Sequence, residues 1–297
     1  MSDISSAGVP VPTGRIDQTS GGYTLTFERR LDVPVNHVWE VLTSRDKVAQ
    51  WLGIVTPGWH LGKEYRLDMG ESEVTGTVLQ MSPESGLQLT WEDPLSGESV
   101  LDWQVREEPD GAALQFRTHA NSADFLAEGA AGWQGILDAF DAVVQGVEPG
   151  RDGAARWLEL RDAYAEEFDV SPSMGRLDAE ASPPAIVFER WYSAPVRDVG
   201  SSLDRSTGEL LIGADADVDI TDDAGRARVT VREPVVGGPE ATAARLAAWH
   251  MALDSAGTDL AGQVIHPSSR RLAALRDFYR GPAEAGGPGS GEPSGDG

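Results

Sequence analysis

Residues 14–42 read GRIDQTSGGYTLTFERRLDVPVNHVWEVL, and residues 175–203 read GRLDAEASPPAIVFERWYSAPVRDVGSSL, so the second stretch repeats the first with substitutions. The Phe-Glu-Arg motif that begins at Phe27 returns at Phe188, and the other shared positions have the same spacing of 161 residues. Self-similarity over such a length is typical of a duplicated structural module. The sequence therefore predicts two copies of one fold.

The repeat continues toward the C-terminus with a shorter spacing. Trp133 matches Trp249 after 116 residues, and Tyr164 matches Tyr279 after 115 residues. The second copy therefore lacks about 46 residues, and the missing interval lies between residues 43 and 99 of the first copy. We expect a complete first copy followed by a truncated second one.

Composition limits the possible partners. The chain has 24 Lys and Arg residues against 48 Asp and Glu residues, a net charge of -24, and no cysteine. This charge argues against binding to nucleic acid or to anionic membranes, because that binding depends on neutralising phosphates. The lack of cysteine excludes a thiolate nucleophile and a Cys-ligated metal. With no signal-like N-terminal segment and no run of about 18 apolar residues, the sequence predicts a soluble, cytoplasmic protein.

Periodicity predicts an α+β domain at residues 21–146. Tyr23, Leu25 and Phe27 alternate with polar residues, as expected of a half-buried strand. Similar patterns predict strands near 62–68, 72–81, 87–92, 99–107 and 112–119, with two short helices near 35–42 and 48–52. Residues 123–145 have helical spacing over six turns, so one antiparallel sheet curved around one long helix is the simplest architecture.

The remaining segments complete the expected domain organisation. Residues 1–20 and 282–297 are rich in Gly, Pro and Ser, so we expect both ends to be disordered. A connecting helix at 154–168 is expected within residues 147–171. The truncated second copy, at 172–281, is expected to keep a strand at 186–191, a hairpin at 215–232, a helix at 241–260 and a closing helix at 268–279.

Several motifs in the first copy occur in the order of a known family. They are Pro34-Val35-Asn36-His37-Val38-Trp39-Glu40-Val41-Leu42-Thr43, Trp51-Leu52-Gly53, Gly76-Thr77-Val78, Leu89-Thr90-Trp91 and Gly132-Trp133. In this combination the first copy resembles the START-like (SRPBCC) superfamily, and within it the bacterial family similar to the activator of heat-shock-protein-90 ATPase. The second copy departs from this pattern, because Gly200 stands where Trp39 is and the Trp51-Leu52-Gly53 segment has no counterpart.

The resemblance implies a helix-grip fold, in which a curved antiparallel sheet and the long C-terminal helix enclose a hydrophobic cavity. Strand parity and helix spacing predict which side chains face that cavity. They are Phe27, Trp51, Tyr65, Leu67, Val78, Leu89, Trp91, Trp103, Phe116, Thr118, Trp133, Ile136 and Phe140. Such an apolar set is either a filled core or a ligand-binding cavity, and the polar tips of its aromatic residues would either orient a ligand or bind backbone and water.

The sequence contains little that indicates catalysis. The five histidines, His37, His60, His119, His250 and His266, show no metal-binding spacing, and we expect no metal, no cofactor and no catalytic residue. His119, near the mouth of the expected cavity, could act as a general base, but a solvated histidine is the simpler interpretation.

Three functions are compatible with these patterns. The preferred one is a non-enzymatic domain that binds an apolar small molecule in the cavity of the first copy. The second is a protein-interaction role, such as that of a chaperone cofactor, with an unidentified protein partner. The third is an enzyme similar to aromatases or cyclases, which would require an acid or base among Tyr65, Thr118 and His119.

Overall fold

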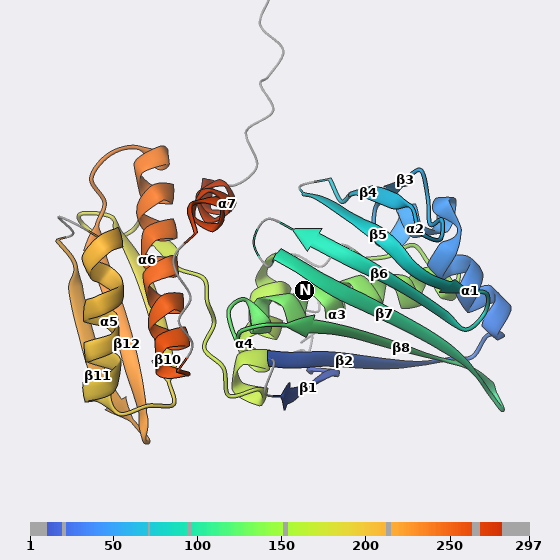
Figure 1. Ribbon diagram of the computed structural model, residues 1–297, viewed down its shortest axis with the longest axis horizontal. Coiled ribbons are helices and arrows are strands. Elements are labelled where there is room, and N and C mark those ends of the chain that lie inside the picture. The colour runs from blue at the N-terminus through green and yellow to red at the C-terminus, as the bar shows by residue number, and fades with distance from the viewer. Residues whose placement is uncertain are drawn as a thin grey trace, which may run out of the picture.

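The computed structural model describes residues 11–19, 22–70, 72–93, 95, 97–150, 154–211, 215–262 and 268–280. These residues form two antiparallel sheets, each with its own hydrophobic core (Figure 1). We call the part around the larger sheet, residues 11–167, the first domain. The part around the smaller sheet, residues 176–280, is the second domain.

The first domain is built on an eight-stranded sheet in the order β1-β2-β8-β7-β6-β5-β4-β3. Its strands are β1 (Gly14–Thr19), β2 (Gly22–Leu31), β3 (Ile54–Thr56), β4 (Glu64–Asp68), β5 (Glu73–Ser82), β6 (Gly86–Asp93), β7 (Gly97–Glu108) and β8 (Gly111–Ala120). Buried and exposed side chains alternate along β4, as the period of two requires. The sequence thus directs one face of the sheet toward the core.

Four helices belong to the first domain: α1 (Val35–Thr43), α2 (Arg45–Trp51), α3 (Leu126–Val144) and α4 (Ala154–Glu167). Along α3, Ala130, Gln134, Leu137 and Val144 are buried, which follows the helical period of 3.6 residues. This face of α3 packs on the concave side of the sheet (Figure 1). The arrangement confirms the predicted α+β class and the helix-grip fold.

The N-terminal segment corrects one expectation. Residues 14–19 lie in the stretch 1–20 that was expected to be disordered, yet they form β1 and pair with β2. The prediction was wrong because it rested on the composition of the segment alone. The residues that pair with β1 lie elsewhere in the chain. Tyr164 accepts a hydrogen bond from the backbone N–H of Gly14 at 2.8 Å. A Cβ at Gly14 would lie 2.6 Å from the Phe27 ring, so only glycine allows this approach. Residues 1–10 and 282–297 lie outside the described residues.

The second domain has four strands in the order β11-β12-β10-β9. They are β9 (Arg176–Asp178), β10 (Ala185–Tyr192), β11 (Asp217–Asp223) and β12 (Arg226–Pro234), accompanied by α5 (Val196–Leu210), α6 (Pro239–Leu260) and α7 (Ser269–Arg280). The strand order matches that of β7-β8-β2-β1 in the first sheet. This correspondence supports the interpretation that the second domain is a truncated copy.

The core of the second domain lies between its sheet and its own helices. The truncated copy has fewer strands than the first to cover Ile186 and Phe188. Both side chains are 1% exposed and pack with Val199 of α5 and Leu253 of α6. The fifteen-residue α5 is longer than its counterpart α1, and α5 and α6 together cover the short sheet.

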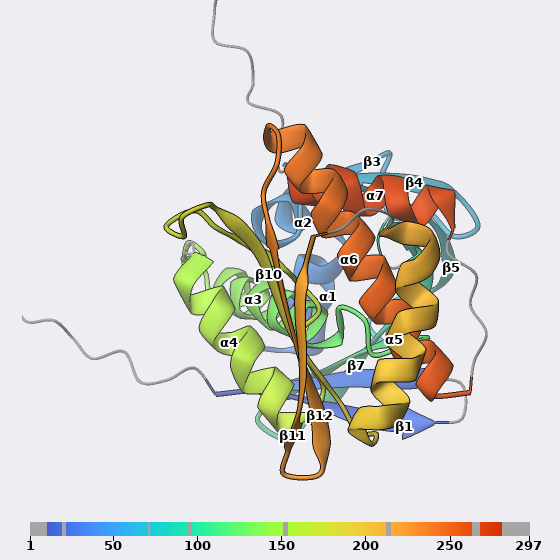
Figure 2. The same cartoon turned by 90° about the vertical axis from the view of Figure 1, so that its left-hand side faces the viewer.

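The two domains are nevertheless in contact (Figures 1 and 2). Trp191 of β10 packs against the core of the first domain. Met251 of α6 and Leu275 of α7 form a small apolar cluster with Leu95 and Phe125 of the first domain.

No helix among the described residues is long and apolar enough to cross a membrane.

Candidate functional site

Aromatic side chains gather on the concave side of the first sheet. We call Trp51, Trp91, Trp103, Phe116 and Trp133 the aromatic cluster. They come from α2, β6, β7, β8 and α3 in turn. Ring centroids are 4.3 Å apart between Trp103 and Phe116, 4.5 Å between Phe116 and Trp133, and 5.3 Å between Trp91 and Trp133. These are the separations at which aromatic rings attract each other.

Burial divides the thirteen side chains that the sequence assigned to the cavity. Ten are buried: Phe27, Trp51, Tyr65, Leu67, Val78, Leu89, Trp91, Trp103, Phe116 and Phe140. Thr118, Trp133 and Ile136 are half-buried, so the set reaches solvent at these three residues. The buried members pack on one another, as Trp51 does on Trp103 and Phe140 at 5.7 and 5.0 Å. The cavity itself therefore stays a prediction.

The polar tips of two buried aromatic residues bind the backbone. The Tyr65 hydroxyl donates to the Thr90 carbonyl oxygen at 2.7 Å, and Trp51 Nε1 donates to the Val41 carbonyl oxygen at 3.1 Å. Burial raises the pKa of Tyr65. This tyrosine is therefore poorly placed to exchange a proton with a ligand, which removes one of the three acid–base candidates.

The other two candidates lie near the end of β8. Thr118 faces Leu25 and His119 faces Thr24 across the ladder between β2 and β8. Both are half-buried. His119 thus lies near the C-terminal end of strand β8, as expected from its position in the sequence.

A second concave site lies between the domains, and sequence reasoning did not predict it. This interdomain cleft has a volume of about 470 Å³. Its walls come from the adjoining ends of β1 and β2, the loop between β8 and α3, the connector between α4 and β9, strand β10, and the C-terminal half of α6. The aromatic residues Tyr23, Trp191 and Tyr192 line it together with Asp124, Arg190 and Asp254.

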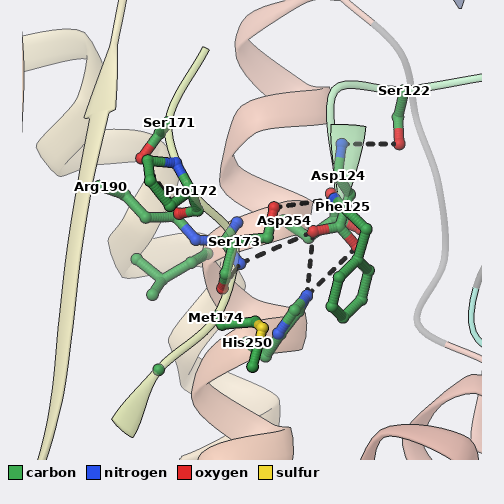
Figure 3. Close-up of polar contacts among 12 residues, drawn as sticks. Ser122, Asp124, Phe125, Ser171, Pro172, Ser173, Met174, Arg190, His250 and Asp254 are labelled. Atoms are coloured by element: carbon green, nitrogen blue, oxygen red, sulfur yellow. Dashed lines mark hydrogen bonds and ion pairs between the residues drawn. The ribbon is translucent and has the colours of Figure 1, made fainter. Parts of the chain in front are cut away.

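A buried group of charged residues joins the two domains at the cleft (Figure 3). We call Asp124, Arg190, His250, Asp254 and Arg271 the interdomain cluster. The Asp124 carboxylate of the first domain lies 2.9 Å from His250 Nε2 and 3.7 Å from an Arg190 terminal nitrogen, and it also contacts Arg271. Its side chain is 1% exposed. A carboxylate of one domain thus neutralises cations of the other in a place that excludes water.

The hydrogen bonds fix the proton positions around His250. Nε2 faces the Asp124 carboxylate, which can only accept, so Nε2 carries the proton. Nδ1 then accepts from the Tyr279 hydroxyl at 2.7 Å, and the Tyr279 oxygen accepts from the Gly175 N–H at 3.0 Å. Burial, together with Arg190 and Arg271, lowers the pKa of His250 against the opposing effect of Asp124, which keeps the imidazole neutral.

The two carboxyl groups of the cluster are shifted in opposite directions. Burial alone would raise the pKa of Asp124, but its hydrogen bond with His250 and the nearby Arg190 and Arg271 hold it well below its usual range. For Asp254, burial and then the charge of Asp124 raise the pKa to about 7. The cleft therefore pairs one carboxyl group whose pKa is lowered, Asp124, with one whose pKa is raised, Asp254.

The connector between the domains is fixed by Glu128 of α3. Its carboxylate accepts hydrogen bonds from the backbone N–H groups of Ser173 and Met174 at 2.6 and 3.1 Å. The Ser173 carbonyl oxygen in turn accepts from Arg190 at 2.7 Å. These contacts hold the floor of the cleft to both domains.

Within the described ranges, no group of three or more His, Asp and Glu side chains is arranged to hold a metal ion.

Sequence reasoning treated His250 only as one of five scattered histidines. The available signal was the repeat itself, because Arg190 and Asp254 match Arg29 and Asp138 of the first copy. Retention of these charged residues in a truncated copy could have marked them. Nothing in the sequence indicated that Asp124 is their partner.

Residues 32–145 match the family described as Activator of Hsp90 ATPase homolog 1-like protein. The matched segment includes the motifs from Pro34 to Trp133 on which the predicted resemblance depended, and it ends before the second domain begins. No curated protein matches the chain.

Three solved structures illustrate what the chain is similar to. CalU16 from Micromonospora echinospora is 20% identical over 52% of this chain and 92% of its own, with a TM-score of 0.43. EF2215 from Enterococcus faecalis is 18% identical over 52% of this chain and 90% of its own, with a TM-score of 0.45. DynU16, a putative protein in the dynemicin biosynthetic locus, is 16% identical over 80% of this chain and 98% of its own, with a TM-score of 0.41.

Proposed function

We propose that the first domain, a START-like domain of the activator of Hsp90 ATPase homolog 1-like kind, binds an apolar small molecule on the concave face of its sheet. The ligand contacts the solvent-facing side of the aromatic cluster. The second domain supports this site from outside and, in our interpretation, is a truncated copy of the first.

The observation that carries the proposal is the position of Trp133. Its ring lies against Trp91, Trp103 and Phe116, yet the residue is only half-buried. Covering the exposed part of this indole with apolar surface would be favourable. Half-buried Ile136 follows three residues later on the same helix, and an apolar ligand at this position would cover both side chains.

A neutral fluorescent probe, N-phenyl-1-naphthylamine, tests this site. We expect it to bind the full chain, and we expect Trp133→Ala to weaken binding about tenfold, the upper range for one aromatic contact. Trp157→Ala is the matched control, since Trp157 is a half-buried tryptophan on α4 outside the cluster. Equal loss of affinity in both variants, or no binding to the wild type, would contradict the proposal. Mass spectrometry of the natively purified protein would then identify a natural ligand.

A protein-interaction role is the second candidate, and the family match favours it. If the protein acts as a chaperone cofactor, adding it to Hsp90 should raise the ATPase rate. The same assay with Trp133→Ala separates the two functions, because a role independent of the concave face would be unaffected by that substitution.

A further inference from the structure

Strand β11 lies at an open edge of the second sheet. It pairs with β12 on one side, and no strand among the described residues pairs with its other side. β11 also lies on the side of the second domain away from the first (Figures 1 and 2). Val218 of this strand is 37% exposed. Such an edge can accept a further strand, because its outward backbone N–H and C=O groups have no partner in the sheet.

The first sheet shows what this edge can hold. β11 has the place in its sheet that β7 has in the larger one, and β7 is flanked by β8 on one side and β6 on the other. Trp103 of β7 faces Leu87 of β6, and both residues are 1% exposed. On the same side, the Val105 N–H donates to the Ser85 carbonyl oxygen at 2.8 Å. Val218 follows Trp103 by 115 residues, but none of the described strands stands where β6 does.

The turn between β11 and β12 identifies the backbone groups that face the open edge. Asp223 and Arg226 close a two-residue turn whose central residues have φ angles of 54° and 87°. The closing pair of such a hairpin is hydrogen-bonded, and bonded pairs alternate with unbonded pairs along the ladder. The residues two, four and six positions before Asp223 therefore bond to β12. The N–H groups of Val218 and Ile220 point to the open edge, as that of Val105 does in β7.

The side chains of β11 indicate the chemistry of a partner strand. Asp217 and Asp219 are exposed on one face of the strand, whereas Val218 lies on the other face, opposite a buried valine of β12. Neither aspartate has an ion pair within the described part of the chain, and Arg232, opposite Asp217, is paired with Asp178. A strand in the place of β6 would put two of its residues beside these carboxylates and the residue between them beside Val218. Opposite charges on paired strands attract, so basic residues fit the first two positions.

A second copy of this chain is a poor occupant of the same edge. Two β11 strands side by side would bring Asp217 and Asp219 of one copy against those of the other, and the chain already carries a net charge of -24. Like charges on paired strands are destabilising, and charged edge strands oppose pairing between copies. The edge therefore favours a strand of opposite charge.

We propose that β11 binds an extended basic segment of a partner protein, which adds as an antiparallel strand in the place that β6 has in the first sheet. The segment has Lys or Arg beside Asp217 and Asp219 and an apolar residue beside Val218. Main-chain hydrogen bonds supply the affinity in this kind of recognition, and alternate side chains supply the specificity. The site belongs to the second domain and does not depend on the concave face of the first.

Fluorescence anisotropy of the full chain with a labelled peptide, Thr-Val-Lys-Leu-Lys-Val-Thr, tests the proposal. This peptide places its lysines beside Asp219 and Asp217 and its leucine beside Val218. The control has the same sequence with methyl groups on the backbone nitrogens of the leucine and the first valine, and we expect it to bind at least about tenfold more weakly, since these N–H groups pair with β11. Equal binding of the two peptides, or no binding of the first, would overturn the proposal.

Charge variants locate the site. Asp217→Asn combined with Asp219→Asn should weaken binding of the peptide at least about threefold, the effect of two exposed ion pairs. Glu166→Gln combined with Glu167→Gln removes the same charge from exposed positions on α4 and is the matched control, which should bind as the wild type does. An equal loss in both double variants would mean that the peptide responds only to net charge, and the proposal would fail.

The backbone pairing has its own test. Val218→Pro removes an outward N–H and leaves the ladder to β12 intact, which edge strands tolerate, so peptide binding should fall at least about tenfold while circular dichroism stays as in the wild type. Should this variant not fold, amide exchange in the wild type decides: the Val218 and Ile220 N–H groups should exchange at least about tenfold more slowly with the peptide bound. Unchanged exchange, or loss of peptide binding in Trp133→Ala, would place the peptide elsewhere and overturn the proposal.

Discussion

The two domains contain the same arrangement of polar residues in different surroundings. In the first domain, the Tyr164 hydroxyl bonds to Gln134 and accepts from the Gly14 N–H. Close by, a terminal nitrogen of Arg29 lies 3.2 Å from a carboxylate oxygen of Asp138. Tyr164 and Gln134 are buried and the Arg29 side chain is 10% exposed, whereas the Asp138 side chain is 38% exposed and reaches the surface.

In the second domain, the corresponding Tyr279 hydroxyl bonds to His250 and accepts from the Gly175 N–H. Arg190 and Asp254 stand where Arg29 and Asp138 are in the first copy. Here His250 and Arg190 are buried, at 0% and 6% side-chain exposure, and the Asp254 side chain is 21% exposed, less than Asp138.

The difference comes from the packing of the first domain against the second. The first domain brings Asp124 against the second arrangement, and histidine in place of glutamine gives that carboxylate a hydrogen-bond donor. Gln134 of the first arrangement is hydrogen-bonded by the backbone of Thr13 and Val11 in its own domain, whereas His250 of the second is hydrogen-bonded by Asp124 of the neighbouring domain. The comparison teaches that similar local contacts become an interface only when a complementary charge covers them.

The largest expected effect follows from separating the domains. A fragment of residues 11–170 should fold and unfold cooperatively, because its core is complete. A fragment of residues 172–281 should lack a fixed tertiary structure, since Arg190 and His250 lose Asp124 and Met251 loses its apolar cover. Near-UV circular dichroism and urea titrations measure both. Cooperative unfolding of the isolated second fragment would show that the interdomain cluster is not needed for its fold.

Removing one carboxylate is a sharper test of the same difference. Asp124→Ala leaves Arg190 and His250 buried without their carboxylate partner, so the free energy of unfolding should fall by about 3–5 kcal/mol. Asp138→Ala breaks a half-exposed pair and should cost at most about 1 kcal/mol. Urea denaturation of both variants gives the comparison. Similar losses would mean that burial does not distinguish the two arrangements.

The cores differ at matched positions as well. Trp103 is 1% exposed, whereas Val218, which follows it by 115 residues, is 37% exposed on β11. Trp103→Ala should destabilise the first domain by about 3–5 kcal/mol, and Val218→Ala should change stability by less than about 0.5 kcal/mol. Thermal melting followed by tryptophan fluorescence checks both. An unchanged midpoint for Trp103→Ala would place this residue outside the core.

The smallest effect concerns pH. Because the pKa of Asp254 is raised in the folded state, its contribution to stability is present at low pH and is lost as the pH rises toward about 7. The pKa of His250 is lowered, so its contribution is present above the unfolded value of about 6.5 and is lost on acidification. Between pH 5 and pH 7 the two contributions oppose each other, and the wild-type stability should change little.

Asp254→Asn should expose the contribution of His250. Its free energy of unfolding should decrease from pH 7 to pH 5, by at most about 1.4 kcal/mol per pH unit, the limit for one proton. Urea midpoints across this range measure the slope. Asp277→Asn, at a carboxylate that is 69% exposed on α7, should keep the wild-type profile. A flat profile for Asp254→Asn would show that these two groups do not compensate.

The sequence determined the elements and the class of the first domain. Alternation along β2 and β4 to β8 and the helical period of α3 are local properties, so these elements could be placed within a few residues of their observed ends, whereas the three-residue β3 was not predicted. The aromatic residues of the candidate site could be named for the same reason, since parity determines which side chains share a face. Conserved spacing between the copies also identified Arg190 and Asp254 as retained residues.

Only the tertiary structure decided what those residues contact. Strand β1 forms because Tyr164 and β2 supply partners from 150 and about ten residues away, which composition cannot reveal. The interdomain cluster joins Asp124 to His250 across 126 residues, and its unusual proton affinities arise from burial that exists only after docking. Charge and hydrogen bonding act through space, so a carboxylate that looks like part of an acidic surface in the sequence becomes the centre of a buried site.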